Sequence, residues 1–168
     1  SHYTSDETAR AEARFFVEHA KRLNLPSNTV MVNDMEDNKM KDNINNNTQS
    51  WTDEMKRLGF SNLMYYTSAS WLDVNNLRGK GPVQTSRFGL ENFWVAQYPT
   101  PTLSTDGAKS LKYNSNAGAW QFTSQAELLT GRHVFDHSVD YTGRFTSHAK
   151  PINHATGQPL RGTITVRN

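Results

Sequence analysis

The chain has 168 residues, of which 35% are hydrophobic and 20% charged, with a formal net charge of +2. It is long enough to bury one core, and no run approaches the roughly 20 apolar residues of a membrane-spanning helix. Cysteine is absent, which excludes disulfides and cysteine-ligated metals. The scattered Lys and Arg residues do not form the basic patch of a nucleic-acid-binding protein.

The first half of the sequence alternates predicted helices and strands. A capping box at Thr4–Glu7 begins a helix whose apolar residues recur at helical spacing. The other elements predicted in this half are a strand at 29–35, a helix from about 48 to 59, a strand at 63–67 and a short helix at 70–77. This alternation favours parallel βα units.

The last part of the sequence contains strands with loops but no clear helices between them. These strands are expected at 93–98, 119–123 and 138–141. From Thr146 on, "TSHAKPINHATGQPLRG" has the Pro, Gly and polar content of a linker, followed by one more candidate strand at Thr163–Val166. We therefore expect one domain over residues 1–145 and a loosely packed, linker-like tail over 146–168.

A cluster of carboxylates follows the first predicted strand, in the stretch "VMVNDMEDNKM". Strand side chains alternate faces, so Asp34 and Glu36 should share a face with Val30 and Val32. Asp34 and Glu36 should then lie roughly 7 Å apart. Two acids at such a distance can act on one glycosidic bond. At the carboxyl end of a barrel strand, where active sites form, one acid can have a raised pKa and donate a proton while the other stays ionised.

Other interpretations of the acidic cluster remain open, and a pair of histidines is a further candidate metal site. The cluster after the strand can be a helix N-cap or a solvated turn. With Asp37 and Asn38 it offers oxygen ligands for a metal, but it has neither a turn glycine nor EF-hand spacing. His133 and His137 are four residues apart, yet their segment has no helical pattern that would bring them to one face for zinc. We expect neither metal nor cofactor.

Several motifs together resemble the family 25 glycoside hydrolases, which are the lysozymes (muramidases) of bacterial and phage lysins. They are "SHYTSDETARAEARFF", "VNDMED", "LMYYTSASW", "FWVAQY", and "AWQFTS" with "VDYTGRF". These motifs come in the family's order and cover residues 1–145. Each one is weak alone, and their order carries the resemblance.

The resemblance implies an α/β fold, an irregular TIM-like barrel of the (β/α)5(β)3 type. The first two βα units and most of the third strand of that barrel have no counterpart in these 168 residues. Strand edges that would pair with the missing strands would be exposed. We therefore expect self-association of the 168-residue chain through unpaired sheet edges.

The resemblance also implies which residues act. Glu36 takes the role of general acid/base, Asp34 is its partner that orients the substrate's acetamido group or stabilises charge, and Asp140 is a second acid. His2 matches a histidine that lines the family's barrel, where it is either packed or helps to position the acids, and it is a candidate for substrate binding. The candidates for stacking on sugar rings are Tyr66, Trp71, Trp94, Tyr98 and Trp120. Core packing is the alternative for about half of these aromatics, and Tyr66 and Tyr98 are favoured as functional.

The implied activity is cleavage of the β-1,4 bond between N-acetylmuramic acid and N-acetylglucosamine in peptidoglycan. The expected partner is the glycan strand, with no nucleic acid and no membrane, and the expected location is extracellular or at the cell wall. A truncated lysin domain that only binds glycan is the alternative. A zinc amidase is disfavoured by the scattered histidines and the absence of cysteine.

Overall fold

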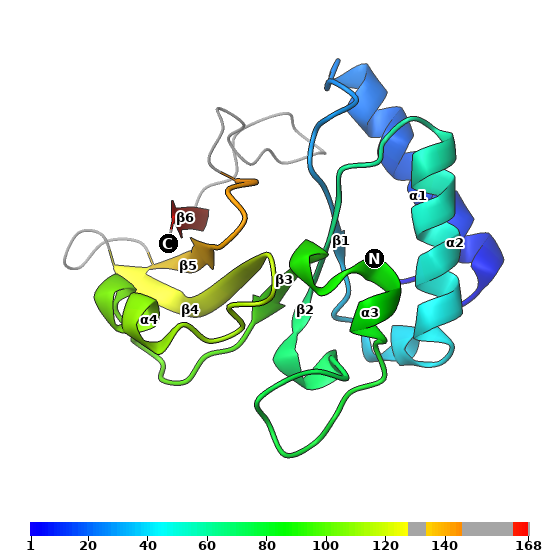
Figure 1. Cartoon of the computed structure of the whole chain (residues 1–168). Helices are drawn as coiled ribbons and strands as arrows, with labels where there is room; N and C mark the ends of the chain where they lie inside the picture. The colour runs from blue at the N-terminus through cyan, green and yellow to red at the C-terminus, as the bar shows by residue number, and fades with distance from the viewer. Residues whose placement is uncertain (128–133, 146–162, 168) are drawn as a thin grey trace. The chain divides into compact units, whose positions relative to one another are not determined.

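The computed structural model describes residues 1–127, 134–145 and 163–167, which form a mixed α/β structure (Figure 1). The chain divides into two compact units, Ser1–Asn92 and Phe93–Asn168. The described elements of the first unit are α1 (Asp6–Arg22), β1 (Met31–Asp34), the 3-10 helix η1 (Asn38–Lys41), α2 (Ile44–Arg57), β2 (Leu63–Ser68), η2 (Ala69–Trp71), α3 (Thr85–Phe88) and η3 (Leu90–Asn92). Those of the second unit are β3 (Phe93–Ala96), α4 (Thr105–Leu111), β4 (Ala119–Glu127), β5 (Val134–Asp140) and β6 (Thr163–Arg167).

Helix α1 begins with a capping box, one residue later than the sequence predicts. The Ser5 side chain accepts a hydrogen bond from the Thr8 amide, and the Thr8 hydroxyl accepts one from the Ser5 amide. In the predicted box, Glu7 accepts the hydrogen bond from the amide of the cap residue. In the structure the Thr8 hydroxyl does this instead, at the third helical position. The helix ends at Arg22, and Asn24 follows it with a left-handed φ of 54°.

Helix α2 begins at Ile44, four residues before the predicted start at 48. It buries Trp51 and Met55, and Gly59 follows it with a φ of +96°, a conformation that glycine adopts without strain. Helices α1 and α2 lie side by side (Figure 1). The buried carboxylate of Glu54 joins them, since it accepts hydrogen bonds from Arg14 on α1 and from Arg57 on α2.

Strands β1 and β2 pair in parallel and carry helix α2 on one face. Asn33 is the register partner of Tyr65. The Tyr65 hydroxyl lies 2.7 Å from the Thr52 hydroxyl of α2, and Asn33 donates to the Tyr3 hydroxyl, which in turn lies 2.7 Å from that of Thr48. Tyr65 therefore faces helix α2.

The segment after β2 departs from the prediction of a helix over 70–77. Only Ala69–Trp71 is helical, as η2. The Asn75 side chain accepts from the Leu77 amide and donates to the Leu72 carbonyl, and such local side-chain bonds compete with a helix. Gly81 then passes so close to the backbone of Trp71 that a Cβ at Gly81 would lie 2.1 Å from the Trp71 carbonyl carbon.

The second unit contains a helix that the sequence analysis missed. Strands β3 and β4 are parallel, and α4 lies between them in the chain. Ser104 caps α4 by accepting from the Gly107 amide, and Ala108 is its only fully buried residue among those described. Two turns with one buried position are too short to show a helical period in the sequence.

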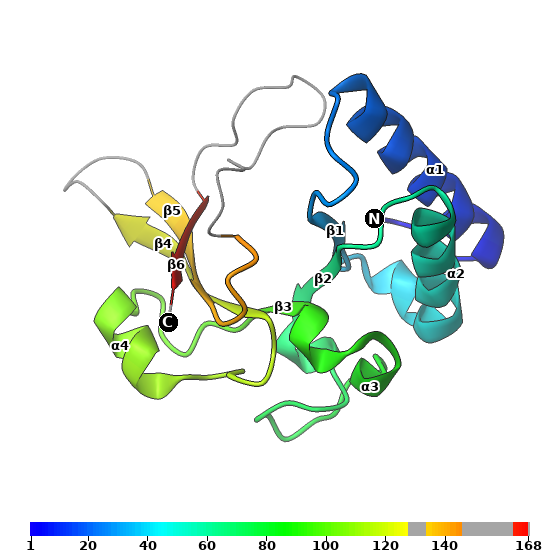
Figure 2. The same cartoon turned by 45° about the horizontal axis from the view of Figure 1, so that its top comes forward.

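The other strands follow the prediction of strands without helical cover. β4 and β5 are antiparallel, and β5 and β6 are parallel, so that the three strands lie next to one another (Figure 2). β6 confirms the candidate strand at Thr163–Val166. The loose packing expected for 146–160 lies outside the described residues. A core of Ala108, Trp120, Phe122 and Val139 holds this unit together.

Candidate active site

The end of β1 presents the two acids of the D-x-E motif. Burial alternates along the strand and just beyond it: Asn33 and Met35 are buried, whereas Asp34 and Glu36 are exposed. Helix α2 covers the Asn33 face through the contacts of Tyr3 and Thr48. Asp34 therefore belongs to the opposite face, as strand alternation predicts, and the exposed Glu36 follows two residues later, beyond the end of the strand.

Tyr66 stands beside Asp34 on the neighbouring strand. The two residues are register partners in the parallel pair, and strands in a sheet are about 4.8 Å apart. Tyr66 is partly exposed, in contrast to the buried Tyr65 next to it. An aromatic ring and a carboxylate are thus placed side by side on the face away from α2, which is an arrangement that suits a sugar.

The backbone on the N-terminal side of Glu36 is held by β2. The Met35 amide donates to the Tyr66 carbonyl at 2.8 Å, and the Thr67 hydroxyl donates to the Met35 carbonyl at 2.7 Å. Met35 and Thr67 are both fully buried. The residue before Glu36 is therefore fixed, although the Glu36 side chain itself is exposed.

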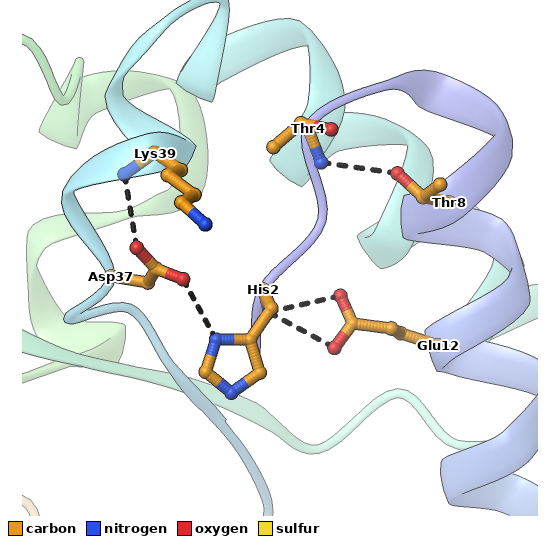
Figure 3. A network of polar contacts seen from close by, with 6 residues as sticks. All are labelled: His2, Thr4, Thr8, Glu12, Asp37 and Lys39. Carbon is orange, nitrogen blue, oxygen red and sulfur yellow. Dashed lines mark hydrogen bonds and ion pairs between the residues drawn. The ribbon is translucent and has the colours of Figure 1, made fainter.

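His2 contacts the residue on the other side of Glu36, as Figure 3 shows. Its Nδ1 lies 2.9 Å from Oδ2 of Asp37, and the His2 backbone amide donates to both carboxylate oxygens of Glu12. The hydrogen bond from His2, followed by that from the Lys39 amide, lowers the pKa of Asp37 below its usual value. Asp37 is also the N-cap of η1, so the N-cap interpretation applies to this one member of the acidic cluster.

Trp71 requires a correction. It was predicted to stack on sugar, but only 5% of it is exposed. The Lys41 ammonium lies 5.0 Å from the centroid of its ring, at cation–π distance. The ring already contacts the Lys41 ammonium and has almost no exposed surface. Trp71 is therefore a packing residue of the first unit.

Asp140, predicted as a second acid, is fully committed to a turn in the second unit. It is 2% exposed. Its Oδ1 accepts from the amides of Thr142 and Gly143, and its Oδ2 accepts from the amide of Phe145 at 2.9 Å. Both oxygens therefore satisfy backbone donors, which accounts for the burial of the side chain and gives Asp140 a structural role. Its role as a second acid stays a prediction.

Two of the aromatic residues predicted to stack on sugar, both in the second unit, keep accessible surface. Trp94 is partly buried, donates from Nε1 to the Ser138 hydroxyl at 2.9 Å, and has its ring 5.1 Å from that of Phe145. Tyr98 is 45% exposed and donates to the side chain of Gln121 at 2.8 Å. The sequence analysis did not single out Ser138 and Gln121, because a polar residue in a strand carries no signal of its partner.

Trp120 is corrected for the same reason as Trp71. It is fully buried, its ring stacks on Tyr113 with centroids 5.3 Å apart, and its Nε1 donates to the Gln97 carbonyl. All these partners belong to the second unit, where Trp120 forms the core with Phe122. No face of its ring is left for a sugar.

The histidine and aspartate of β5 do not form a metal site in the described part of the chain. His133 lies outside the described residues. Burial lowers the pKa of His137 and raises that of its neighbour Asp136. Within residues 1–127, 134–145 and 163–167, no group of three or more His, Asp or Glu side chains is placed to hold a metal ion. Among these same residues, none of the helices has the length and apolar character of a membrane span.

A small cavity of about 110 Å³ opens on the helix side of the first unit. Thr52 and Tyr65 line it, and these two residues belong to the contact between α2 and β2. The cavity is therefore on the face of β2 opposite to Asp34 and Tyr66, and it contains none of the predicted site residues.

Comparison with models of known protein families gives a match. The family model described as "Glycosyl hydrolases family 25" matches residues 1–130. No curated protein and no solved structure matches the chain. The matched residues include the whole of the first unit, with Asp34, Glu36 and Tyr66, and they extend through β4 of the second.

Proposed function

Because the chain belongs to the family 25 glycosyl hydrolases, and is by that membership a glycoside hydrolase, we propose that it cleaves the β-1,4 bond between N-acetylmuramic acid and N-acetylglucosamine of peptidoglycan. One observation carries the proposal: the exposed Asp34 ends β1 beside Tyr66 on the face away from α2, and the exposed Glu36 follows it by two residues. Glycoside hydrolysis uses two carboxylates, and an aromatic ring offers a face on which a sugar can stack.

In the proposed reaction Glu36 is the general acid and then the general base. It donates its proton to the glycosidic oxygen, and the bond between that oxygen and C1 breaks. The carbonyl oxygen of the substrate's 2-acetamido group forms a bond to C1, and Asp34 orients this group and stabilises its positive charge. A water molecule then gives its proton to Glu36 and attacks C1, which restores the acetamido group and retains the configuration.

The other parts of the proposal follow from the same family. We propose the (β/α)5(β)3 barrel for the complete fold, supported by the parallel β1–β2 pair under α2 and by the bare antiparallel strands β4 and β5. The proposed place of action is the cell wall, where the glycan strand is the partner. Self-association of the chain through sheet edges stays a prediction, which light scattering would test.

Product analysis tests the proposed bond. Purified peptidoglycan is incubated with the chain, the new reducing ends are reduced with borohydride, and the products are hydrolysed and identified by mass spectrometry. We expect muramitol, since cleavage at C1 of N-acetylmuramic acid leaves that sugar reducing. Glucosaminitol as the new product would contradict the proposed bond, and binding to the wall without any new reducing end would favour the alternative of a glycan-binding module.

A further inference from the structure

The residue after Glu36 is fixed as firmly as the residue before it. Asp37 makes three contacts at once: its Oδ1 accepts from the Lys39 amide at 3.1 Å, its carbonyl accepts from the Met40 amide at 2.9 Å, and its Oδ2 meets His2. Met40 is fully buried and anchors η1 in the first unit. The exposed Glu36 thus stands between two backbone positions that are each held by several bonds.

The partner of Asp37 is itself held in place. The His2 backbone amide donates to Oε1 and Oε2 of Glu12 on α1 at 3.1 and 3.2 Å. The next residue, Tyr3, is 1% exposed and is bonded through its hydroxyl to Thr48 and Asn33. The imidazole is therefore presented from a segment anchored on α1, α2 and β1, even though the ring is largely solvent-exposed.

We propose that Asp37 is a positioning residue for Glu36, and that the chain of contacts Glu12–His2–Asp37 is the brace that fixes the end of β1 for catalysis. The proposal deepens the proposed function and rests on it, since it assigns a role relative to Glu36. Its physical reason is that a general acid must be held within a few tenths of an ångström of its productive position, and a misplacement of about 1 Å costs up to about a hundredfold in rate. Asp37 and His2 act through the backbone and need not touch the sugar.

The test uses single and paired substitutions in the 168-residue chain. His2→Ala and Asp37→Ala each break the brace, and we expect each to lower kcat about tenfold with KM within about twofold of wild type. The double variant should lose no more than the stronger single variant, because both remove the same contact. In His2→Asn the side-chain amide nitrogen takes nearly the place of Nδ1 and can still donate to Asp37, so we expect most of kcat to return.

A matched control comes from the other end of η1. Asp42 is an exposed aspartate at the C-cap of the same 3-10 helix, and Asp42→Ala removes an equal charge without touching the brace. It should keep the wild-type kcat. An Asp37→Ala chain with unchanged kcat, additive losses in the double variant, or His2→Asn as impaired as His2→Ala would each overturn the proposal.

A second measurement separates this proposal from the proposed function. Backbone 15N relaxation of Met35 to Lys39 does not depend on activity. We expect increased mobility at Glu36 and Asp37 in His2→Ala and Asp37→Ala, and none in Asp42→Ala. If wild type releases no reducing ends, the proposed function fails, whereas unchanged relaxation in the brace variants would overturn the brace itself.

Discussion

Asp34 and Tyr66 are register partners on the adjacent parallel strands β1 and β2, and both belong to the face that α2 does not cover. Tyr65, the next residue to Tyr66, lies on the opposite face and is bonded to Thr52 of α2. Two neighbouring tyrosines therefore have separate roles: one is available beside the acids, and the other fastens a helix to the sheet.

This pair of tyrosines gives a prediction with its control in the same strand. Tyr66→Ala should lower kcat/KM on peptidoglycan about tenfold, because about 1–1.5 kcal/mol of aromatic contact is lost, and Tyr66→Phe should retain most of it. Tyr65→Phe should leave KM unchanged and lower the free energy of unfolding by about 1 kcal/mol, through the loss of the Thr52 hydrogen bond. A loss of kcat/KM in Tyr65→Phe as large as that in Tyr66→Ala would contradict the assignment of faces.

Glu54 predicts how stability depends on pH. The Arg57 hydrogen bond, and then that of Arg14, lowers the pKa of Glu54 below its ordinary value. A lowered carboxylate pKa stabilises the fold at pH values above the unfolded pKa of about 4.3, and this contribution is lost as the pH falls through the folded value. Glu54→Gln should therefore be less stable than wild type by about 1–2 kcal/mol near neutral pH.

The difference between the Glu54→Gln chain and wild type should shrink below pH 4. Urea unfolding at several pH values measures it. The matched control is Glu18→Gln, which removes an exposed pair with Arg22 at the end of α1 and should change the free energy of unfolding by less than about 0.5 kcal/mol. A Glu54→Gln chain that stays destabilised by the same amount at pH 3 would contradict the assigned cause.

Asp140 predicts a structural loss rather than a catalytic one. Asp140→Ala removes the acceptor of three backbone amides and should cost about 2–4 kcal/mol in the free energy of unfolding, whereas Asp140→Asn keeps one acceptor oxygen and should cost about 1–2 kcal/mol. The turn that it holds carries Phe145 against Trp94, so tryptophan fluorescence should change as well. A folded Asp140→Ala chain of wild-type stability that has lost all activity would restore the catalytic assignment.

The aromatic residues of the second unit predict a division between core and surface. Trp120→Ala should destabilise the chain by about 3–5 kcal/mol, because it empties the centre of a packed core. Tyr98→Ala, at a residue that is 45% exposed, should cost less than about 1 kcal/mol while weakening the binding of glycan. Thermal unfolding and a pull-down with purified wall measure the two effects. Weakened binding in a folded Trp120→Phe chain with unchanged binding in Tyr98→Ala would reverse the assignment.

The sequence predicts the acidic strand well because two constraints agree there. The period of two fixes which residues share a face, and the cost of burying a carboxylate decides which face meets solvent. Trp120 and Trp94 show where such reasoning ends. Each is the second residue of its strand, and only the tertiary packing decides that Trp120 is enclosed by Tyr113 and Phe122.

The contact between His2 and Asp37 could not be predicted, because the two residues are far apart in the sequence. His2 and Asp37 are 35 residues apart, and a contact of such long range leaves no periodicity in the chain. The hydrogen bond from the Lys39 amide to the Asp37 side chain is a local capping pattern. The role of Asp37 as a helix cap can therefore be predicted from the sequence. The missed helix α4 and the shortened helix η2 are short elements, for which local hydrogen bonds outweigh the apolar pattern.

The central claim is that Glu36 supplies the proton for cleavage of the glycan, and its most direct test is the rate at which Glu36→Gln releases reducing ends from purified peptidoglycan. Glutamine keeps the shape of the side chain and removes the transferable proton, so we predict a rate lower by a factor of about 10²–10⁴, with wild-type melting temperature and wild-type binding to the wall. A folded Glu36→Gln chain that releases reducing ends at the wild-type rate would contradict the account.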